Sequence, residues 1–332
     1  MRAIVPPGFG GPEVLVIGEA PEPTPGESDL LVRVRAAGLN RADLLQRMGR
    51  YPPPPGESAL LGLEIAGEVM EVSPGAAGRG PGGRTYNKGD RVMALLAGGG
   101  YAERARVPAA QALPIPEGLS FAEAAAIPEA FLTAWLNLFV LGKLEHGEVV
   151  IVHAAASGVG SAALQLCRGV AGRVLATASK GKLDHCLRLG ATHVLDRAEV
   201  AQALPVAIRA AAGRGADVIL DLVGGAYLDA NITSLDKHGR LLLVSTMSGA
   251  KAELDLGAML TKRLTILGST LRSRSAAQKA KLVASFYSGG WPRLAAGELR
   301  PVLARTFPLE EARAAHELMA SNAVVGKIVL DV

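Results

Sequence analysis

Hydrophobic and polar residues alternate in the first third of the chain, which predicts β-strands with one exposed face. Residues 31–35 read Leu-Val-Arg-Val-Arg, and residues 89–95 enter a further strand through a turn. Between them, residues 75–89 are rich in glycine and predict a surface loop. These patterns predict a compact, mostly β domain.

From Ser120 the pattern changes to apolar strands that alternate with Ala-rich helices. Ser120 and Glu123 have the spacing of a capping box, which predicts a helix start. Helices are also expected from about residue 160 and over residues 182–189. Apolar strands are expected at residues 148–153, 173–177, 192–195, 216–222 and 239–245. This alternation predicts a parallel sheet covered by helices on both faces.

The last segment, from residue 264, returns to a mixed pattern and ends in a strand over residues 327–332. We interpret it as packing back onto the first domain, which makes the α/β region an insertion. A length of 332 residues is also more than one ordinary core requires, so two domains are expected.

Composition and charge narrow the class of protein. Hydrophobic residues make up 49% and charged residues 20%, as in a soluble globular protein. The net charge is +4, but the basic residues are interspersed with acidic ones, so a nucleic-acid partner is not expected. No secretory signal is apparent, and no apolar run is expected to reach the roughly 20 residues that span a bilayer. We therefore expect a cytoplasmic protein without a membrane partner.

The sharpest motif follows the first strand of the α/β region. Gly158, Gly160 and Ala163 fit the G-x-G-x-x-G/A fingerprint, directly before a helix. Such glycines let the backbone approach a pyrophosphate, and the helix N-terminus offers N–H groups to it. A dinucleotide site is favoured over a purely structural turn. His153, at the mouth of the same strand, is interpreted as a packed histidine rather than a catalytic one.

The end of the second strand indicates which dinucleotide binds. A site for NAD would place Asp or Glu there, to hold the ribose hydroxyls. Residues 177–182 instead read Thr-Ala-Ser-Lys-Gly-Lys, whose hydroxyl and two ammonium groups suit a 2′-phosphate. The alternative is that both lysines only decorate a helix start, where the helix dipole disfavours them. NADPH is therefore the expected cofactor.

Metal ligands are scarce. The chain contains no Cys and no His before His146, and its two cysteines are Cys167 and Cys186. This excludes a catalytic zinc of the alcohol dehydrogenase kind and a four-cysteine zinc lobe. We interpret both cysteines as buried apolar residues and expect no metal.

The sequence as a whole resembles the zeta-crystallin-like quinone oxidoreductases, a zinc-free branch of the medium-chain dehydrogenases/reductases. Within that family it looks most similar to the stress-inducible, apoptosis-linked enzymes of animals. The residues that carry the resemblance are 10–13, 39–44, 51–54, 61–64, 127–134, 271–274, 322 and 326–330. Zinc-containing relatives have Gly-His-Glu where this chain has Gly62-Leu63-Glu64.

The resemblance implies an α/β fold with two domains. Residues 1–124 would form a GroES-like, mostly β catalytic domain, and residues 266–332 would return to it. Residues 125–265 would form a Rossmann domain, a doubly wound parallel sheet that binds NADPH. The family further implies an active site in the interdomain cleft and a homodimer that pairs edge strands of the Rossmann sheets.

The resemblance also assigns site residues by position. Asn40 and Tyr51 would be catalytic and would line the nicotinamide end of the cofactor site. The other cofactor-binding positions would be Thr133, Ser157, Gly158, Val159, Gly160, Ser179, Lys182, Val223, Gly224, Met247, Thr270, Leu271, Arg272 and Asn322.

The assignments of Asn40 and Tyr51, and the preference for NADPH, have competing interpretations. Asn40 and Asp43 could simply cap a helix, and Tyr51 could pack against the proline run that follows it. The family often has an Asn-Tyr pair where this chain has Leu195-Asp196. The carboxylate of Asp196 would repel a 2′-phosphate and weaken the preference for NADPH, although Lys182 remains.

Three functions fit the sequence. The first is reduction of quinones by NADPH, with Tyr51 and Asn40 donating hydrogen bonds to the carbonyl oxygen. No strong general acid is evident. The second is reduction of α,β-unsaturated aldehydes or ketones, which requires a proton donor. The third is an NADPH-binding protein with a structural, sensing or single-stranded RNA-binding role, disfavoured because only 4% of residues are aromatic.

Overall fold

The computed structural model describes all 332 residues of the chain, which divide into two compact units. Unit 1 combines Met1–Leu132 with Leu271–Val332, and unit 2 is Thr133–Thr270. Both boundaries lie later in the chain than the expected ones at residues 124 and 265. The α/β fold class agrees with the expectation.

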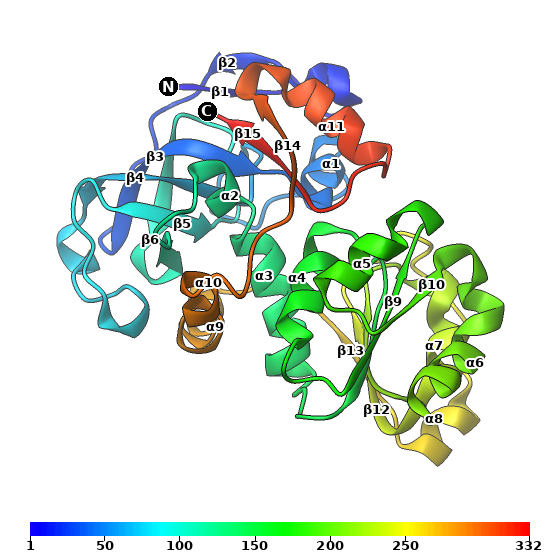
Figure 1. Ribbon diagram of the computed structural model, residues 1–332. Coiled ribbons are helices and arrows are strands. Elements are labelled where there is room, and N and C mark those ends of the chain that lie inside the picture. The colour runs from blue at the N-terminus through cyan, green and yellow to red at the C-terminus, as the bar shows by residue number, and fades with distance from the viewer. The chain divides into compact units, whose positions relative to one another are not determined.

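Unit 1 is built on a seven-stranded sheet with the order β14-β15-β3-β4-β5-β7, and β6 pairs with β3 (Figure 1). A separate pair joins β1 and β2. The strands are β1 Arg2–Ile4, β2 Ile17–Glu19, β3 Asp29–Gly38, β4 Glu64–Val72, β5 Arg91–Leu95, β6 Arg104–Pro108, β7 Ala112–Pro114, β14 Leu303–Pro308 and β15 Lys327–Asp331.

The C-terminal strand lies inside this sheet rather than beside it. β15 pairs antiparallel with β3, so that Val329 is opposite Gly38 and Asp331 is opposite Ala36. It pairs parallel with β14 on its other side. The first and last parts of the chain therefore share one sheet.

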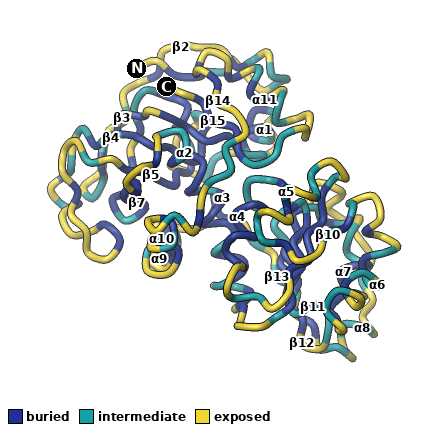
Figure 2. The backbone as a smooth tube through the Cα atoms, viewed as in Figure 1, coloured by how far each residue is buried: buried dark blue, intermediate teal, exposed yellow.

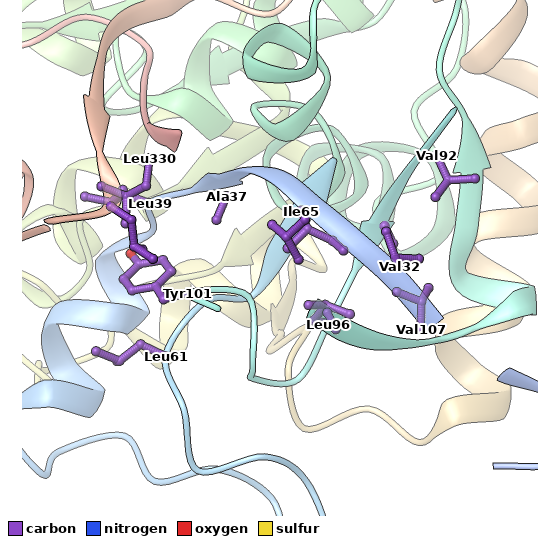
Figure 3. Close-up of a cluster of buried hydrophobic side chains, with 14 of the residues drawn as sticks. Val32, Ala37, Leu39, Leu61, Ile65, Val92, Leu96, Tyr101, Val107 and Leu330 are labelled. Carbon is purple, nitrogen blue, oxygen red and sulfur yellow. The ribbon is translucent and has the colours of Figure 1, made fainter. Parts of the chain in front are cut away.

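The core of unit 1 follows from the alternation along β3. Val32, Val34 and Ala36 are buried, whereas Arg33 and Arg35 between them are exposed. Figure 3 shows the buried side chains gathered along this strand, and Figure 2 shows the burial of the strands beneath exposed loops.

Six helices begin in unit 1. They are α1 Arg41–Arg47, α2 Phe121–Ala125, α3 Pro128–Trp135, α9 Ala276–Gly289, α10 Trp291–Ala295 and α11 Ala312–Ala320. The capping box predicted at the start of α2 is present, because Glu123 N donates to Ser120 Oγ at 3.2 Å and Ser120 N donates to Glu123 Oε2 at 2.9 Å.

Unit 2 contains one six-stranded sheet with the order β10-β9-β8-β11-β12-β13, and every neighbouring pair is parallel. Counted along the chain, this order is 3-2-1-4-5-6, the dinucleotide-binding arrangement. The strands are β8 Val149–Val152, β9 Arg173–Ala178, β10 His193–Asp196, β11 Ala216–Asp221, β12 Leu235–Leu243 and β13 Thr265–Gly268.

Helices cover both faces of this sheet, as its continuous apolar strands require. Helices α4 and α5 lie together on one face, and α6, α7 and α8 lie together on the other (Figure 1). The helices are α4 Gly158–Cys167, α5 Leu183–Leu189, α6 Val200–Ala212, α7 Leu228–Ser234 and α8 Leu256–Lys262. Five strands were expected; the sixth, β13, was missed.

One expectation about apolar length was wrong. The helical segment Phe121–Leu141 has 21 residues and a mean hydropathy of 1.6, which is long and apolar enough to cross a membrane. It runs through α2 and α3 into a π-helical stretch, Leu136–Leu141. However, 72% of its most apolar window is buried inside the protein, as in a core helix.

Candidate active site

The cofactor residues expected in unit 2 follow the carboxyl ends of its parallel strands. This is the edge at which ligands bind open α/β sheets, next to the point where the strand order reverses. Residues 157–160 follow β8, Ser179 and Lys182 follow β9, Val223 and Gly224 follow β11, Met247 follows β12, and Thr270 follows β13. The structure thus brings most of the predicted binding positions to one edge.

The glycine loop forms a close-packed start to α4. Ser157 is the N-cap, and Gly160 N donates to Ser157 Oγ at 3.0 Å. A Cβ at Gly160 would lie 2.5 Å from Ala154 O and 2.6 Å from Ala155 Cα. Only glycine therefore lets the helix start lie this close to the turn, and the N-terminal end of α4 points its N–H groups at the carboxyl edge of the sheet.

Below this loop, His153 is fully buried and bonded. Its Nδ1 lies 2.9 Å from Thr177 Oγ1, and its Nε2 lies 2.7 Å from Asn231 Oδ1. Burial lowers the pKa of His153, so the imidazole is neutral at pH 7. This agrees with the interpretation of a packed histidine that joins β8 to β9.

The chain of polar contacts continues to a carboxylate that the sequence did not single out. Asn231 Nδ2 donates to Asp221 Oδ2 at 3.0 Å. Asp221 Oδ1 accepts from Val223 N at 2.7 Å and from Gly224 N at 2.9 Å. Asp221 therefore fixes the backbone of the loop at which Val223 and Gly224 were expected to contact the cofactor.

Two neighbouring cations, Lys182 after β9 and Arg197 after β10, lie at the carboxyl edge of the sheet. Ser179 occupies the N-cap position of the short turn that contains Lys182, without a side-chain capping hydrogen bond. Burial first, and then the nearby Arg197, lower the pKa of Lys182. Asp196, the expected source of repulsion, accepts a hydrogen bond from Ala198 N at 3.1 Å and caps its own turn. Arg197 was missed by sequence reasoning because it lies 15 residues from Lys182, after the next strand.

Two further expected residues of unit 2 lie in contrasting surroundings. Thr133 is buried in α3, and its carbonyl accepts from Asn137 Nδ2 at 2.8 Å. Met247 is 55% exposed in the loop after β12.

In unit 1, Asn40 belongs to a buried ionic group. Lys327 Nζ lies 2.6 Å from Glu64 Oε1 and donates to Asn40 Oδ1 at 2.7 Å. Asn40 Nδ2 donates to the same Glu64 oxygen at 2.9 Å. Gly38 provides the space, since a Cβ there would lie 2.4 Å from Glu64 Oε1. We call Asn40, Glu64 and Lys327 the Glu64 cluster.

These bonds bear on the donor role expected of Asn40. Its amide nitrogen is engaged by Glu64 and, at 3.4 Å, by Gly38 O. The side chain is therefore bonded within the protein, which favours a role in positioning over direct contact with a carbonyl oxygen. The backbone of Asn40 meanwhile caps α1, because Asn40 N donates to Asp43 Oδ2 at 2.8 Å.

Asp43 leads into a second buried network. Its carboxylate also accepts from Gly62 N and from Tyr101 Oη, both at 3.2 Å. Tyr101 Oη lies 3.3 Å from His316 Nε2, and Arg47 Nη1 lies 3.5 Å from His316 Nδ1. Burial raises the pKa of Asp43 to about 6. Burial, aided by Arg47, lowers the pKa of His316 to about 3.

The lowered pKa of His316 predicts acid destabilisation. An unfolded histidine binds a proton near pH 6.5 while the folded one does not, so this stability is present above pH 6.5 and is lost as pH falls. We expect the unfolding free energy of the wild type, minus that of His316→Gln, to fall by about 2 kcal/mol between pH 7 and pH 5. Urea unfolding at each pH measures it; Asp43 is present in both proteins. Parallel pH curves would contradict this prediction.

Tyr51 and Arg272, which are both expected site residues, lie in contact with each other. The guanidinium carbon of Arg272 is 5.4 Å from the centre of the Tyr51 ring, and Arg272 Nη1 donates to Tyr51 O at 3.1 Å. Arg272 Nε donates to Ala97 O at 2.8 Å, and Leu271 beside it is buried. Asn322 lies apart from this pair, with a left-handed backbone (φ 56°) and a hydrogen bond from Arg41.

Comparisons with known proteins agree with this architecture. The family model of the alcohol dehydrogenase GroES-like domain matches residues 26–117, and that of zinc-binding dehydrogenases matches residues 189–330. The quinone oxidoreductase of Lama guanicoe is 33% identical, and the match covers 99% of this chain and 97% of that protein. The chain belongs to the quinone oxidoreductase-like branch of the medium-chain dehydrogenases/reductases. It is therefore an oxidoreductase with a GroES-like domain and a Rossmann domain.

Other similar proteins are also matched over most of their length. The human synaptic vesicle membrane protein VAT-1 homolog is 32% identical, over 99% of this chain and 86% of that protein. A mycobacterial protein solved as a complex with NADPH has a TM-score of 0.87 and 28% identity, over the full length of both chains. A nicotinamide cofactor follows from the family.

Proposed function

We propose that this medium-chain oxidoreductase reduces quinones with NADPH and works without zinc. The observation that carries the proposal is the carboxyl edge of the six-stranded sheet. There the close-packed turn at Gly160 lies on the same edge as the cations Lys182 and Arg197. The relatives named quinone oxidoreductase and the mycobacterial complex with NADPH support the same proposal.

The residues of this edge suit a phosphorylated dinucleotide. The N–H groups at the start of α4 would hold the pyrophosphate, with Gly160 keeping the helix close to the turn. Lys182 and Arg197 would hold a 2′-phosphate, which Ser179 can also reach by hydrogen bonding. Asp221 would keep the Val223–Gly224 backbone in place beside the cofactor.

This assignment predicts how cofactor preference changes. In the double variant Lys182→Ala/Arg197→Ala, we expect the Kd for NADPH to rise at least about tenfold, because two charge-assisted hydrogen bonds are lost. The Kd for NADH, which lacks the 2′-phosphate, should stay the same. Fluorescence titration with both cofactors measures this. An equal loss for NADH would point to general damage of the fold.

Unit 1 supplies the groups that would donate hydrogen bonds to the acceptor. When bound, the nicotinamide supplies a hydride equivalent to an electron-poor acceptor. Burial, followed by the nearby Glu129, raises the pKa of Tyr51, so its phenol keeps its proton and can donate to a carbonyl oxygen. The Glu64 cluster holds the Asn40 loop in position. We further propose that the protein forms a homodimer through β13, the edge strand of the unit 2 sheet.

The experiment that tests the proposed function compares acceptors and identifies products. Purified protein is given NADPH with 1,2-naphthoquinone, with a 2-alkenal, or with no acceptor, and the organic product is analysed. We expect the hydroquinone to form and the alkenal to remain. A saturated aldehyde formed faster than the hydroquinone would instead establish an alkene reductase. NADPH binding without turnover of either acceptor would favour a sensing or structural protein.

A further inference from the structure

Glu129, in the first turn of α3, is a half-buried residue whose carboxyl group the proposed function does not use. Its backbone N donates to Glu64 Oε2 at 2.8 Å, while its own Oε2 is buried without any hydrogen-bond partner. Burial first, and then the carboxylate of Glu64, raise the pKa of Glu129 to about 8. The raised pKa favours the protonated, neutral form of the Glu129 carboxyl group at pH 7.

Titratable groups from several elements surround Glu129. They are Asp43 on α1, Glu64 on β4, Lys279 on α9, Lys327 on β15, and Tyr51 and Arg272 in loops. The two carboxylates favour the protonated form of Glu129. The cations would stabilise the carboxylate that remains once the proton has left. Such surroundings suit a group that gives up a proton and then regains it.

Two of these cations are buried, and one of them has a donor without a partner. Arg272 is only 3% exposed; its Nε and Nη1 are bonded to backbone carbonyls, but its Nη2 is buried with no partner. Lys279 is also 3% exposed and forms no salt bridge. A buried donor without a partner, such as Arg272 Nη2, is costly and suits a place where a ligand completes the bonding. The Tyr51 ring lies beside the Arg272 guanidinium and gives it an aromatic neighbour.

We propose that Glu129 is the general acid of the reaction, and that Arg272 and Lys279 bind the acceptor oxygen that receives its proton. This inference rests on the proposed function, because it assigns the proton that quinone reduction consumes. The cations would attract the oxygen as negative charge builds on it, which is the task of preorganised donors.

The step balances in atoms and electrons. NADPH provides a hydride, that is, two electrons and one proton, and becomes NADP⁺. The quinone that accepts the hydride becomes a hydroquinone monoanion. The O–H bond of Glu129 breaks, an O–H bond forms on the anionic oxygen, and a neutral hydroquinone leaves. The Glu129 carboxylate then takes a proton from water.

Kinetics of Glu129→Gln test the proposal. With 1,2-naphthoquinone, we expect kcat to fall about 100-fold, the usual contribution of a general acid. The Kd for NADPH should not change. In the wild type, kcat should fall as pH rises through about 8, and the variant should lack this decline. Glu57→Gln, which removes an exposed carboxylate near Lys279, serves as the matched control and should keep both rate and pH profile.

A second measurement detects the proton on the Glu129 carboxyl group in the absence of turnover. Infrared spectra of the protein alone should show a protonated carboxyl band at pH 7 that disappears as pH rises through about 8 and that is absent in Glu129→Gln. Glu129→Asp keeps an acid and should retain part of the rate and a pH-dependent decline, even if the glutamine variant folds poorly.

The outcomes separate the two ideas. If the wild type does not reduce the quinone, the proposed function fails. If the wild type is active and Glu129→Gln keeps its kcat and its pH profile, only the role of Glu129 is overturned. A wild-type infrared spectrum without the band at pH 7 would also overturn it.

Discussion

Replacing Lys327 with methionine is expected to lower the free energy of unfolding by about 3–5 kcal/mol. This is the usual cost of removing one partner from a buried ion pair. Glu64 is fully buried, and Lys327 Nζ lies 2.6 Å from its Oε1. Without the ammonium group, the carboxylate would remain buried with only the Asn40 amide and the Glu129 N–H as donors. Asn40 Oδ1 would lose its donor as well. Urea unfolding measures the change.

A matched control separates burial from charge. Arg313 and Glu317 form an ion pair on α11 at 2.9 Å, but their side chains are 62% and 50% exposed. Arg313→Met should cost no more than about 0.5 kcal/mol. The double variant Lys327→Met/Glu64→Gln should recover part of the lost stability, since no buried charge is left uncompensated. If Lys327→Met lowers the free energy of unfolding no more than Arg313→Met does, the Glu64 cluster does not stabilise the fold as a buried ion pair.

Replacing Gly160 with alanine is expected to weaken NADPH binding at least about tenfold, equivalent to about 1.4 kcal/mol. The added Cβ would lie within 2.7 Å of three backbone atoms of Ala154 and Ala155. Backbone atoms cannot rotate away as a side chain can, so the start of α4 must move, and overpacking of this kind typically costs about 1–3 kcal/mol. The helix N–H groups then no longer meet the pyrophosphate. Titration of protein fluorescence with NADPH measures the Kd.

Gly8→Ala provides the comparison for Gly160→Ala. No atom lies within 4 Å of a Cβ at Gly8, and the backbone there does not require glycine. Its Kd for NADPH should equal that of the wild type. Unchanged NADPH binding by Gly160→Ala would show that the loop does not hold the pyrophosphate.

The sequence was most informative where the relevant residues are contiguous. Residues 153–163 contain a strand end, a glycine turn and a helix start, so the dinucleotide loop could be predicted from local pattern alone. The five strands that were predicted in unit 2 are apolar and bounded by turns. The sixth strand, β13, was missed because its four residues, Thr-Ile-Leu-Gly, lie in the segment from residue 264 that was assigned to the first domain.

The polar groups of unit 1 could not be predicted, because the residues that form them lie far apart in the sequence. Glu64 and Lys327 meet across 263 positions of sequence, through the pairing of β15 with β3 and of β3 with β4. In the sequence, each of these two residues stands out only as part of a stretch that resembles the family. Sequence reasoning found no general acid, because the proton on Glu129 depends on burial and on a neighbouring carboxylate that no local pattern reveals.

The most direct test of the proposed function is the initial rate of NADPH oxidation by purified protein with and without 1,2-naphthoquinone, repeated with NADH and with Gly160→Ala. We expect oxidation that depends on the quinone, that is much slower with NADH, and that loses at least about tenfold in kcat/KM for NADPH in the variant. No quinone-dependent oxidation at NADPH concentrations that saturate the wild-type protein would contradict the proposal.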